Sequence, residues 1–287
     1  MTATTRRGAL TNGPRWLYPA KAVVTRARSV AWSIRREPPL PPQGLLRILF
    51  YHRVSDDRDE LAVSPRHFRQ QMQTLAELGL RGVDVVTAME LWQAHERTPP
   101  LVALSFDDAY RDIAEHAAPV LRAHRFSATM FVPTGLVEGI AASVRWLPPL
   151  LDWDEIGALD REGVLRMEAH SITHPNLLAL DEESVRRELA GSRTELEARL
   201  GRTVTAFAYP AGLAGAREAR IAREVGYLVA VSCEPGLNDE HADLFLLART
   251  QIDARDNLLD FRAKLGGGHD APLPFRRLYR RRRFGAS

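Results

Sequence analysis

The sequence predicts an α/β fold in which a parallel sheet closes, or nearly closes, into a barrel. Seven short apolar runs have the length and composition of buried strands. They are residues 46–52, 101–106, 127–132, 163–170, 203–209, 227–232 and 245–251. Most are followed by an amphipathic helical pattern, an alternation that is typical of parallel sheets. With 287 residues, the chain is long enough for one barrel of this kind.

The predicted helices carry their own boundary signals. The stretch 64–79 begins with a serine N-cap and a first-turn proline and ends at a glycine. Thr87 and Glu90 have capping-box spacing, which indicates a second helix. Two further patterns, over residues 181–201 and 217–226, each end at a glycine.

The N-terminal extension predicts a basic amphipathic helix over residues 15–36. The proline-rich stretch EPPLPPQG (37–44) separates it from the body of the protein. Its apolar stripe consists of Trp16, Ala20, Val23, Ala27, Val30 and Ile34, with Pro19 near the start of the helix. Two interpretations are open: peripheral contact with an anionic membrane through 15–36 and the arginine-rich 276–283, or packing on the protein's own surface or on a second subunit.

Both ends of the chain are basic, whereas its body is acidic. Residues 1–44 carry eight basic side chains and one acid, and residues 269–287 carry six arginines and one aspartate. Because the whole chain has a net charge of +3, the part between these ends has a charge of −9. The arginine run lacks a nucleic-acid recognition fold, so no nucleic-acid partner is expected.

The composition and the hydropathy pattern argue against a disulfide, a membrane-spanning helix and a signal peptide. The single cysteine, Cys233, excludes an internal disulfide. No apolar run reaches the roughly 20 residues of a membrane-spanning helix, and no continuous apolar segment of a signal peptide is present. The expected location is therefore the cytoplasm, with peripheral attachment to the inner face of the cytoplasmic membrane as the alternative. The sequence leaves the oligomeric state open.

Polar residues stand at the ends of several predicted strands. Asp107 and Asp108 follow the second strand, His52 the first and His170 the fourth. In a parallel barrel these strand ends meet on one face, where active sites lie. Adjacent carboxylates repel each other unless a positive group lies close by, so the stretch LSFDDAYRDI (104–113) indicates either two solvated carboxylates or a cation at this face.

The stretch HSITH (170–174) supplies two imidazoles four residues apart. On a helical turn this spacing places both side chains on one side. The pattern alone is common on protein surfaces. Together with one carboxylate of the doublet, it makes the three protein ligands of an open catalytic zinc site. The second carboxylate is then available to accept a proton from water.

These residues resemble three motifs of the polysaccharide deacetylase family, also called the NodB homology domain or carbohydrate esterase family 4. SFDDAYRD (105–112) is similar to the first motif and HSITH to the second. FAYPAG (207–212) is similar to the FAYPxG form of the third motif, found in a branch that resembles the poly-N-acetylglucosamine deacetylases. The resemblance covers about residues 46–250.

The resemblance implies a distorted (β/α)7 barrel over residues 45–265, between an extension (1–44) and a basic tail (266–287). It implies a metal-dependent hydrolase that removes N-acetyl or other N-acyl groups from amino sugars of a poly- or oligosaccharide or a lipid-linked glycan. The alternatives are a deformylase or O-acetyl esterase acting on a glycan, and a catalytically silent glycan-binding module.

The resemblance also assigns roles to individual residues. Asp107 matches the catalytic base, and the metal ligands are Asp108, His170 and His174. The expected metal is Zn²⁺, with Co²⁺, Ni²⁺ or Mn²⁺ as alternatives. The motif segment Tyr209, Pro210 and Ala211 is expected to bind the substrate and the oxyanion.

The general acid is harder to identify, because no LxxH-type fifth motif is present near the C-terminus. His52, in the YHRV stretch (51–54), matches a histidine of the same branch and is the first choice. A hydrogen-bonded structural histidine is the alternative reading of His52. His241 and His269 are further candidates. Trp146 and Trp153, in the insertion 135–156, are expected either to contact a sugar ring or to pack in the core.

Three substitutions depart from the family pattern. Ala109 replaces a glycine, which is tolerable if its φ is negative. Ala208 stands where many members have the arginine that pairs with the catalytic aspartate. Asp107 is therefore expected to depend on the metal and on other donors to stay ionised. Ala211 replaces a tyrosine and removes an aromatic wall from the site.

Overall fold

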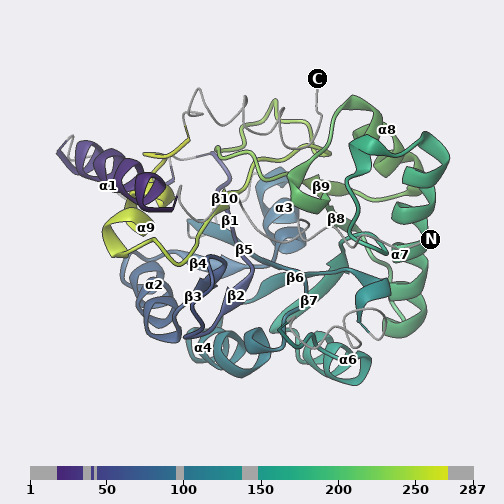
Figure 1. The fold of residues 1–287 in the computed structure, drawn as a ribbon, viewed down its shortest axis with the longest axis horizontal. Coiled ribbons are helices and arrows are strands. Elements are labelled where there is room, and N and C mark those ends of the chain that lie inside the picture. Colours follow the sequence, from purple (N-terminus) through teal and green to yellow (C-terminus); the bar gives the residue numbers. More distant parts are fainter. Residues whose placement is uncertain (1–17, 35–39, 42–43, 95–99, 138–147, 271–287) are drawn as a thin grey trace, which may run out of the picture.

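A parallel sheet that curls into a half-barrel, with helices around it, forms the body of the protein (Figure 1). The computed structural model describes residues 18–34, 40–41, 44–94, 100–137 and 148–270. The sheet has the strand order β10-β1-β5-β6-β7-β8-β9, and β4 pairs with β5 beside this path. Its strands are β1 (Ile48–Tyr51), β4 (Arg81–Val83), β5 (Leu101–Asp107), β6 (Ala128–Val132), β7 (Leu165–Ala169), β8 (Ala206–Ala208), β9 (Val229–Val231) and β10 (Thr250–Gln251).

Each of the seven predicted apolar runs contains one strand of this sheet, which confirms the predicted fold class. The sequence did not reveal β4, because the triplet RGV is too short and too polar to stand out as an apolar run. This strand pairs with the first half of β5 (Gly82↔Val102), whereas β6 pairs with the second half (Ser105↔Thr129). A separate small sheet joins β2 (Arg53–Val54) and β3 (Ala62–Val63).

The segment before β10 narrows the gap between the two ends of the sheet. Leu247 forms a parallel bridge with Val231 of β9. Three residues later, Thr250 of β10 pairs with Leu49 of β1. Residues 247–251 therefore reach from β9, at one edge of the sheet, to β1, near the other edge.

Helices cover the outside of the sheet, and α3 packs against its other face (Figure 1). On the two faces together, the helices are α2 (Pro65–Glu77), α3 (Val85–Gln93), α4 (Ala118–His124), α6 (Trp153–Glu162), α7 (Glu182–Leu200), α8 (Ala216–Val225) and α9 (Leu258–Leu265). Ser64 is the N-cap of α2 and Asp181 that of α7, as predicted. The expected capping role of Thr87 is wrong: α3 begins a turn earlier, and Asp84 accepts the Thr87 backbone N–H.

The N-terminal helix α1 (Tyr18–Ile34) lies beside α9 at the flank of the barrel (Figure 1). Within the part of the chain that the structure describes, no helix is long and apolar enough to cross a membrane.

Candidate active site

The acidic doublet lies at the carboxyl end of β5, as predicted. Asp107 is the last residue of the strand, and Asp108 is the first residue beyond it. The Asp108 backbone has a φ of 75° and donates its N–H to the carbonyl of Phe131 in β6, over 3.1 Å. Successive side chains of a strand point to opposite faces. The left-handed turn at Asp108 interrupts this alternation and gives the two carboxylates different surroundings.

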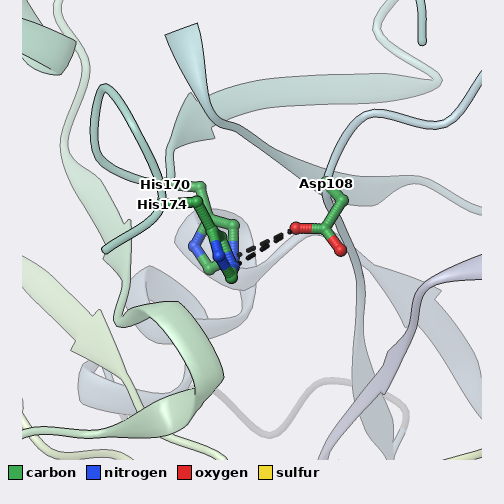
Figure 2. Close-up of side chains that lie close together, drawn as sticks. All are labelled: Asp108, His170 and His174. Atoms are coloured by element: carbon green, nitrogen blue, oxygen red, sulfur yellow. Dashed lines mark ion pairs between the residues drawn. The ribbon is translucent and has the colours of Figure 1, made fainter. Parts of the chain in front are cut away.

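Asp108 forms a compact cluster with two histidines (Figure 2). Its Oδ1 atom lies 3.6 Å from His170 Nε2 and 3.5 Å from His174 Nε2. In a tetrahedral zinc site with metal–ligand distances near 2.0–2.1 Å, the ligand atoms are about 3.3–3.4 Å apart. The two distances from Asp108 are close to this spacing, all three donor atoms lie within 4.8 Å of one another, and their chemistry suits zinc.

The environment of His170 prepares one ring nitrogen as a ligand. Its Nδ1–H donates to the carbonyl of Ala208, over 2.7 Å, so the lone pair belongs to Nε2, which faces Asp108. Burial lowers the pKa of His170 to about 4, although the charge of Asp107 opposes this shift. The imidazole is therefore neutral at neutral pH, the form that binds metals.

The loop from His170 to His174 is fixed by contacts within itself and with α7. Its backbone does not form a helical turn, because Ser171 and His174 have φ values of 64° and 56°. Ser171 Oγ accepts the His174 N–H over 3.0 Å. Glu188 of α7 accepts the N–H groups of Ile172 and Thr173 over 2.8 and 2.9 Å. These bonds hold the two imidazoles together without a helix.

A buried arginine holds Asp107. Arg249 donates from Nη1 to Asp107 Oδ1 over 2.8 Å and from Nη2 to Oδ2 over 2.9 Å. Its guanidinium lies 4.4 Å from the ring centre of Phe50 and 5.4 Å from that of Phe131. Burial raises the pKa of Asp107, but the charge and hydrogen bonds of Arg249, together with the nearby His170 and His52, outweigh it and bring the pKa to about 2. Asp107 is therefore ionised over the whole physiological range.

Arg249 supplies the partner that Ala208 cannot. It lies in the segment that approaches both β9 and β1, so its side chain enters the barrel from another part of the chain. From the sequence alone, this stretch predicts only a strand. The available signal was one arginine within the run FLLARTQ (245–251), because a buried arginine requires a carboxylate partner.

His52 lies close to Asp107, in the loop between β1 and β2. It is near enough for its positive charge to lower the pKa of Asp107. Its Nδ1 atom is buried and has no hydrogen-bond partner among the residues that the structure describes. The loop is held by Asp112, which accepts the Arg53 Nε–H over 2.8 Å and the Val54 N–H over 3.2 Å. The loop that carries His52 is thus tied to the loop that follows the acidic doublet.

The other proposed proton donors lie elsewhere. His241 is exposed in a loop beside Glu240. His269 is packed against α1, where its Nε2 lies 2.9 Å from Ser29 Oγ.

The residues predicted to contact the substrate lie in different parts of the structure. Trp153 begins α6 and stacks with Arg199, whose guanidinium carbon is 4.8 Å from the ring centre, so it makes a packing contact within the protein. Trp146 lies outside the described residues. The Tyr209 side chain is buried and donates its hydroxyl to the carbonyl of Phe245 over 2.9 Å. Pro210 and Ala211 form the turn after β8.

Unfavourable backbone conformations concentrate in this region. Six non-glycine residues of the described chain have positive φ, and five belong to the loops of the site: Asp108, Ala109, Ser171, His174 and Ala211. Ala109 has a φ of 56°, so the condition under which alanine replaces glycine at no cost is not met. Such conformations persist where surrounding contacts impose them, and they are typical of functional sites.

Comparisons with known proteins agree on one family. Residues 94–230 match the family model described as polysaccharide deacetylase. The chain is similar to YxkH of Bacillus subtilis (strain 168), whose name assigns it provisionally to the polysaccharide deacetylases, with 26% identity over 223 residues, or 77% of this chain and 75% of YxkH.

Solved structures share the fold. IcaB from Ammonifex degensii has a TM-score of 0.64 and 26% identity, over 72% of this chain and 91% of IcaB. The Streptococcus pyogenes deacetylase PplD, solved in complex with acetate, has a TM-score of 0.67 and 24% identity, over 76% of this chain and 98% of PplD.

Proposed function

Because this chain belongs to the polysaccharide deacetylase family, we propose that it is a metal-dependent hydrolase that removes N-acetyl groups from amino sugars of a glycan. The observation that carries this proposal is the position of an ionised, arginine-paired Asp107 next to the cluster of Asp108, His170 and His174. A base beside a three-ligand cluster is the arrangement expected of hydrolytic metal sites.

The cluster fits a divalent ion, and Zn²⁺ is the ion that its donors suit best. Asp108, His170 and His174 would hold it, and the Ala208 carbonyl would keep His170 in the required tautomer. When bound, such an ion polarises the acyl carbonyl and lowers the pKa of water.

The protein's own groups would then move the protons. Asp107 accepts a proton from the attacking water, because its carboxylate is ionised and its position is fixed by Arg249. His52 donates a proton to the departing amine, which cannot leave as its anion. A backbone N–H near Ala211 stabilises the negative charge that develops on the acyl oxygen, since Pro210 has no N–H and that of Tyr209 donates to the carbonyl of Val231.

Acyl release from a panel of N-acyl glycans, detected by mass spectrometry, tests this proposal. The panel contains chitooligosaccharides and lipid-linked N-acetylhexosamines, and metal content is measured on the same samples. We expect about one divalent ion per chain, lost together with activity in His174→Ala. His241→Ala is the matched control, because that histidine is exposed and outside the cluster.

The same panel separates the alternatives. Release of formate or of an O-linked acetyl group would assign a deformylase or an esterase that uses the same groups. Glycan binding without any turnover, in a sample with a full complement of metal, would show a binding module and contradict the proposal. Full activity of metal-free protein would contradict the role of the cluster.

A further inference from the structure

The helix α1 is fixed against the body of the protein by its polar side. Arg26 Nη2 lies 2.8 Å from Asp260 Oδ2 of α9. The fully buried Ser29 contacts His269, and Arg28 donates to the carbonyl of Gly268 over 3.3 Å. These contacts leave little freedom for the helix to rotate about its axis, so the direction of its other side is also fixed.

The outward side of α1 is apolar. Val23 and Ile34 are 68% and 74% exposed, and Val24 and Val30 are 41% and 43% exposed. Four of the five large hydrophobic side chains that are exposed in the described chain therefore lie on this one helix, and the fifth is Leu228. Val23, Val30 and Ile34 recur at helical spacing and form one continuous face, here called the outer stripe together with Val24.

This orientation is the reverse of that of an ordinary surface helix. A helix that packs on its own protein usually turns its apolar stripe towards the body. The helix does pack on its own protein, but it turns Arg26, Ser29 and Trp32 inward, and the stripe outward. Contiguous exposed apolar side chains of this kind mark an interaction surface.

The sequence that adjoins this surface is basic. No acidic residue occurs within α1, and Arg35 and Arg36 follow it directly in the sequence. The segment around His269, which contacts α1, leads into the arginine-rich stretch 276–283. Five residues lie between Asp270 and Arg276, the first of these arginines, so a fully extended chain spans at most about 22 Å between them. Basic residues are therefore close in sequence to the outer stripe and to the segment that contacts α1, whereas residues 45–268 are acidic overall.

The apolar stripe and the basic sequence that adjoins it together indicate which kind of partner covers this surface. A second copy of the chain on the stripe would bring two basic regions together, which is unfavourable. A nucleic acid would use the arginines but not the valines and the isoleucine. We propose that the outer stripe docks in the interface of an anionic phospholipid bilayer, where acyl chains cover the apolar side chains and lipid phosphates pair with the arginines.

Flotation with vesicles tests this proposal on the full-length protein. Vesicles of phosphatidylcholine mixed with phosphatidylglycerol are compared with vesicles of phosphatidylcholine alone. We expect binding to the anionic vesicles, and a fall of at least about tenfold in the partition coefficient for the double variant Val23→Ser, Val30→Ser, because apolar area is lost from the interface. Leu228→Ser is the matched control, since it removes an exposed large side chain outside α1.

A second variant separates charge from apolar contact. Replacing Arg276, Arg277 and Arg280 by glutamine should weaken binding and reduce its dependence on salt. The proposal is overturned if the wild-type protein does not float with anionic vesicles, or if the double valine variant floats as well as wild type. It is also overturned if the protein is a dimer that becomes monomeric in the valine variant without vesicle binding, because the stripe would then cover a second copy.

Discussion

Two buried arginines, at opposite ends of the barrel, make the same contact with an aspartate in very different surroundings. At the carboxyl ends of the strands, Arg249 donates from both terminal nitrogens to Asp107, over 2.8 and 2.9 Å. At the amino ends, Arg47 donates in the same manner to Asp270, over 2.8 and 2.7 Å. Both arginines are fully buried, so each depends on its carboxylate for compensation of its charge.

The surroundings of the aspartate decide what each pair does. Asp107 is buried next to the Asp108 cluster, so Arg249 controls the charge and direction of a reactive group. Asp270 is partly exposed, and Arg47 also donates to the carbonyl of Leu265 at the end of α9. The second pair therefore anchors the segment on which α1 packs. The same bidentate arginine–aspartate pair serves the proposed chemistry at one end of the barrel and attaches a chain segment at the other.

Removal of the two carboxylates should give the largest difference in activity between the two ends of the barrel. We expect Asp107→Asn to lower the rate of acyl release by roughly 1,000-fold, because an amide cannot accept the proton of the attacking water. Asp270→Asn, which breaks the equivalent pair, should leave the rate within about twofold. Initial rates on one N-acyl glycan measure both, and an Asp107→Asn variant with a near-normal rate would falsify the assignment of the base.

Removal of Arg249 should act through the charge of Asp107. With the arginine, Asp107 has a pKa of about 2, below its ordinary value, so the pair stabilises the fold above pH ~4 and this stability is lost as the pH falls towards 2. In Arg249→Met, burial is opposed only by the nearby His170 and His52, so the pKa of Asp107 rises.

The acid limb of the rate profile should therefore move to higher pH in Arg249→Met, and the rate at neutral pH should fall by about 10–100-fold. Arg249→Lys, which keeps a positive charge, should restore part of the acid limb. The pH dependence of kcat/KM measures these shifts. An unchanged acid limb with reduced stability would show that Arg249 is structural only.

The sequence predicts the motif residues of the site better than the buried arginine that pairs with them. The strand ends and the motif residues Asp107, Asp108, His170 and His174 could be located in advance, because strand periodicity and local motifs are properties of short stretches. Arg249 could not be assigned, since 142 residues separate it from Asp107 and only closure of the barrel brings them together. For the same reason, the outward direction of the α1 stripe depends on contacts of Arg26 and Ser29 with a distant segment.

Removal of Arg47 should affect stability rather than chemistry. Arg47→Met leaves Asp270 without its partner and breaks the bond to the Leu265 carbonyl. Because Asp270 is partly exposed, we expect a loss of about 2–3 kcal/mol, below the 3–5 kcal/mol that is typical of a fully buried pair. Chemical denaturation measures the loss. The acid limb of the activity profile should remain in place, and a shift comparable to that of Arg249→Met would contradict the division between the two ends.

The smallest expected difference between the two ends of the barrel is in thermal stability, and it arises from strained backbone. Ala109, in the site, and Arg125, which follows α4 at the amino ends of the strands, both have a φ of 56°. Glycine at either position relieves roughly 1–2 kcal/mol of left-handed strain and costs about 0.4–1 kcal/mol through the entropy of the unfolded chain. Ala109→Gly also removes a buried methyl group worth about 0.8 kcal/mol.

Arg125→Gly should therefore raise Tm by about 1–2 °C, whereas Ala109→Gly should leave it within about 1 °C. Calorimetry on both variants measures the difference, and acyl release should stay within about twofold of wild type in each. A clear rise in Tm for Ala109→Gly would mean that its methyl group contributes little packing. The left-handed backbone of Ala109 would then be strain that the surrounding site imposes, because the methyl group would make no contact that offsets it.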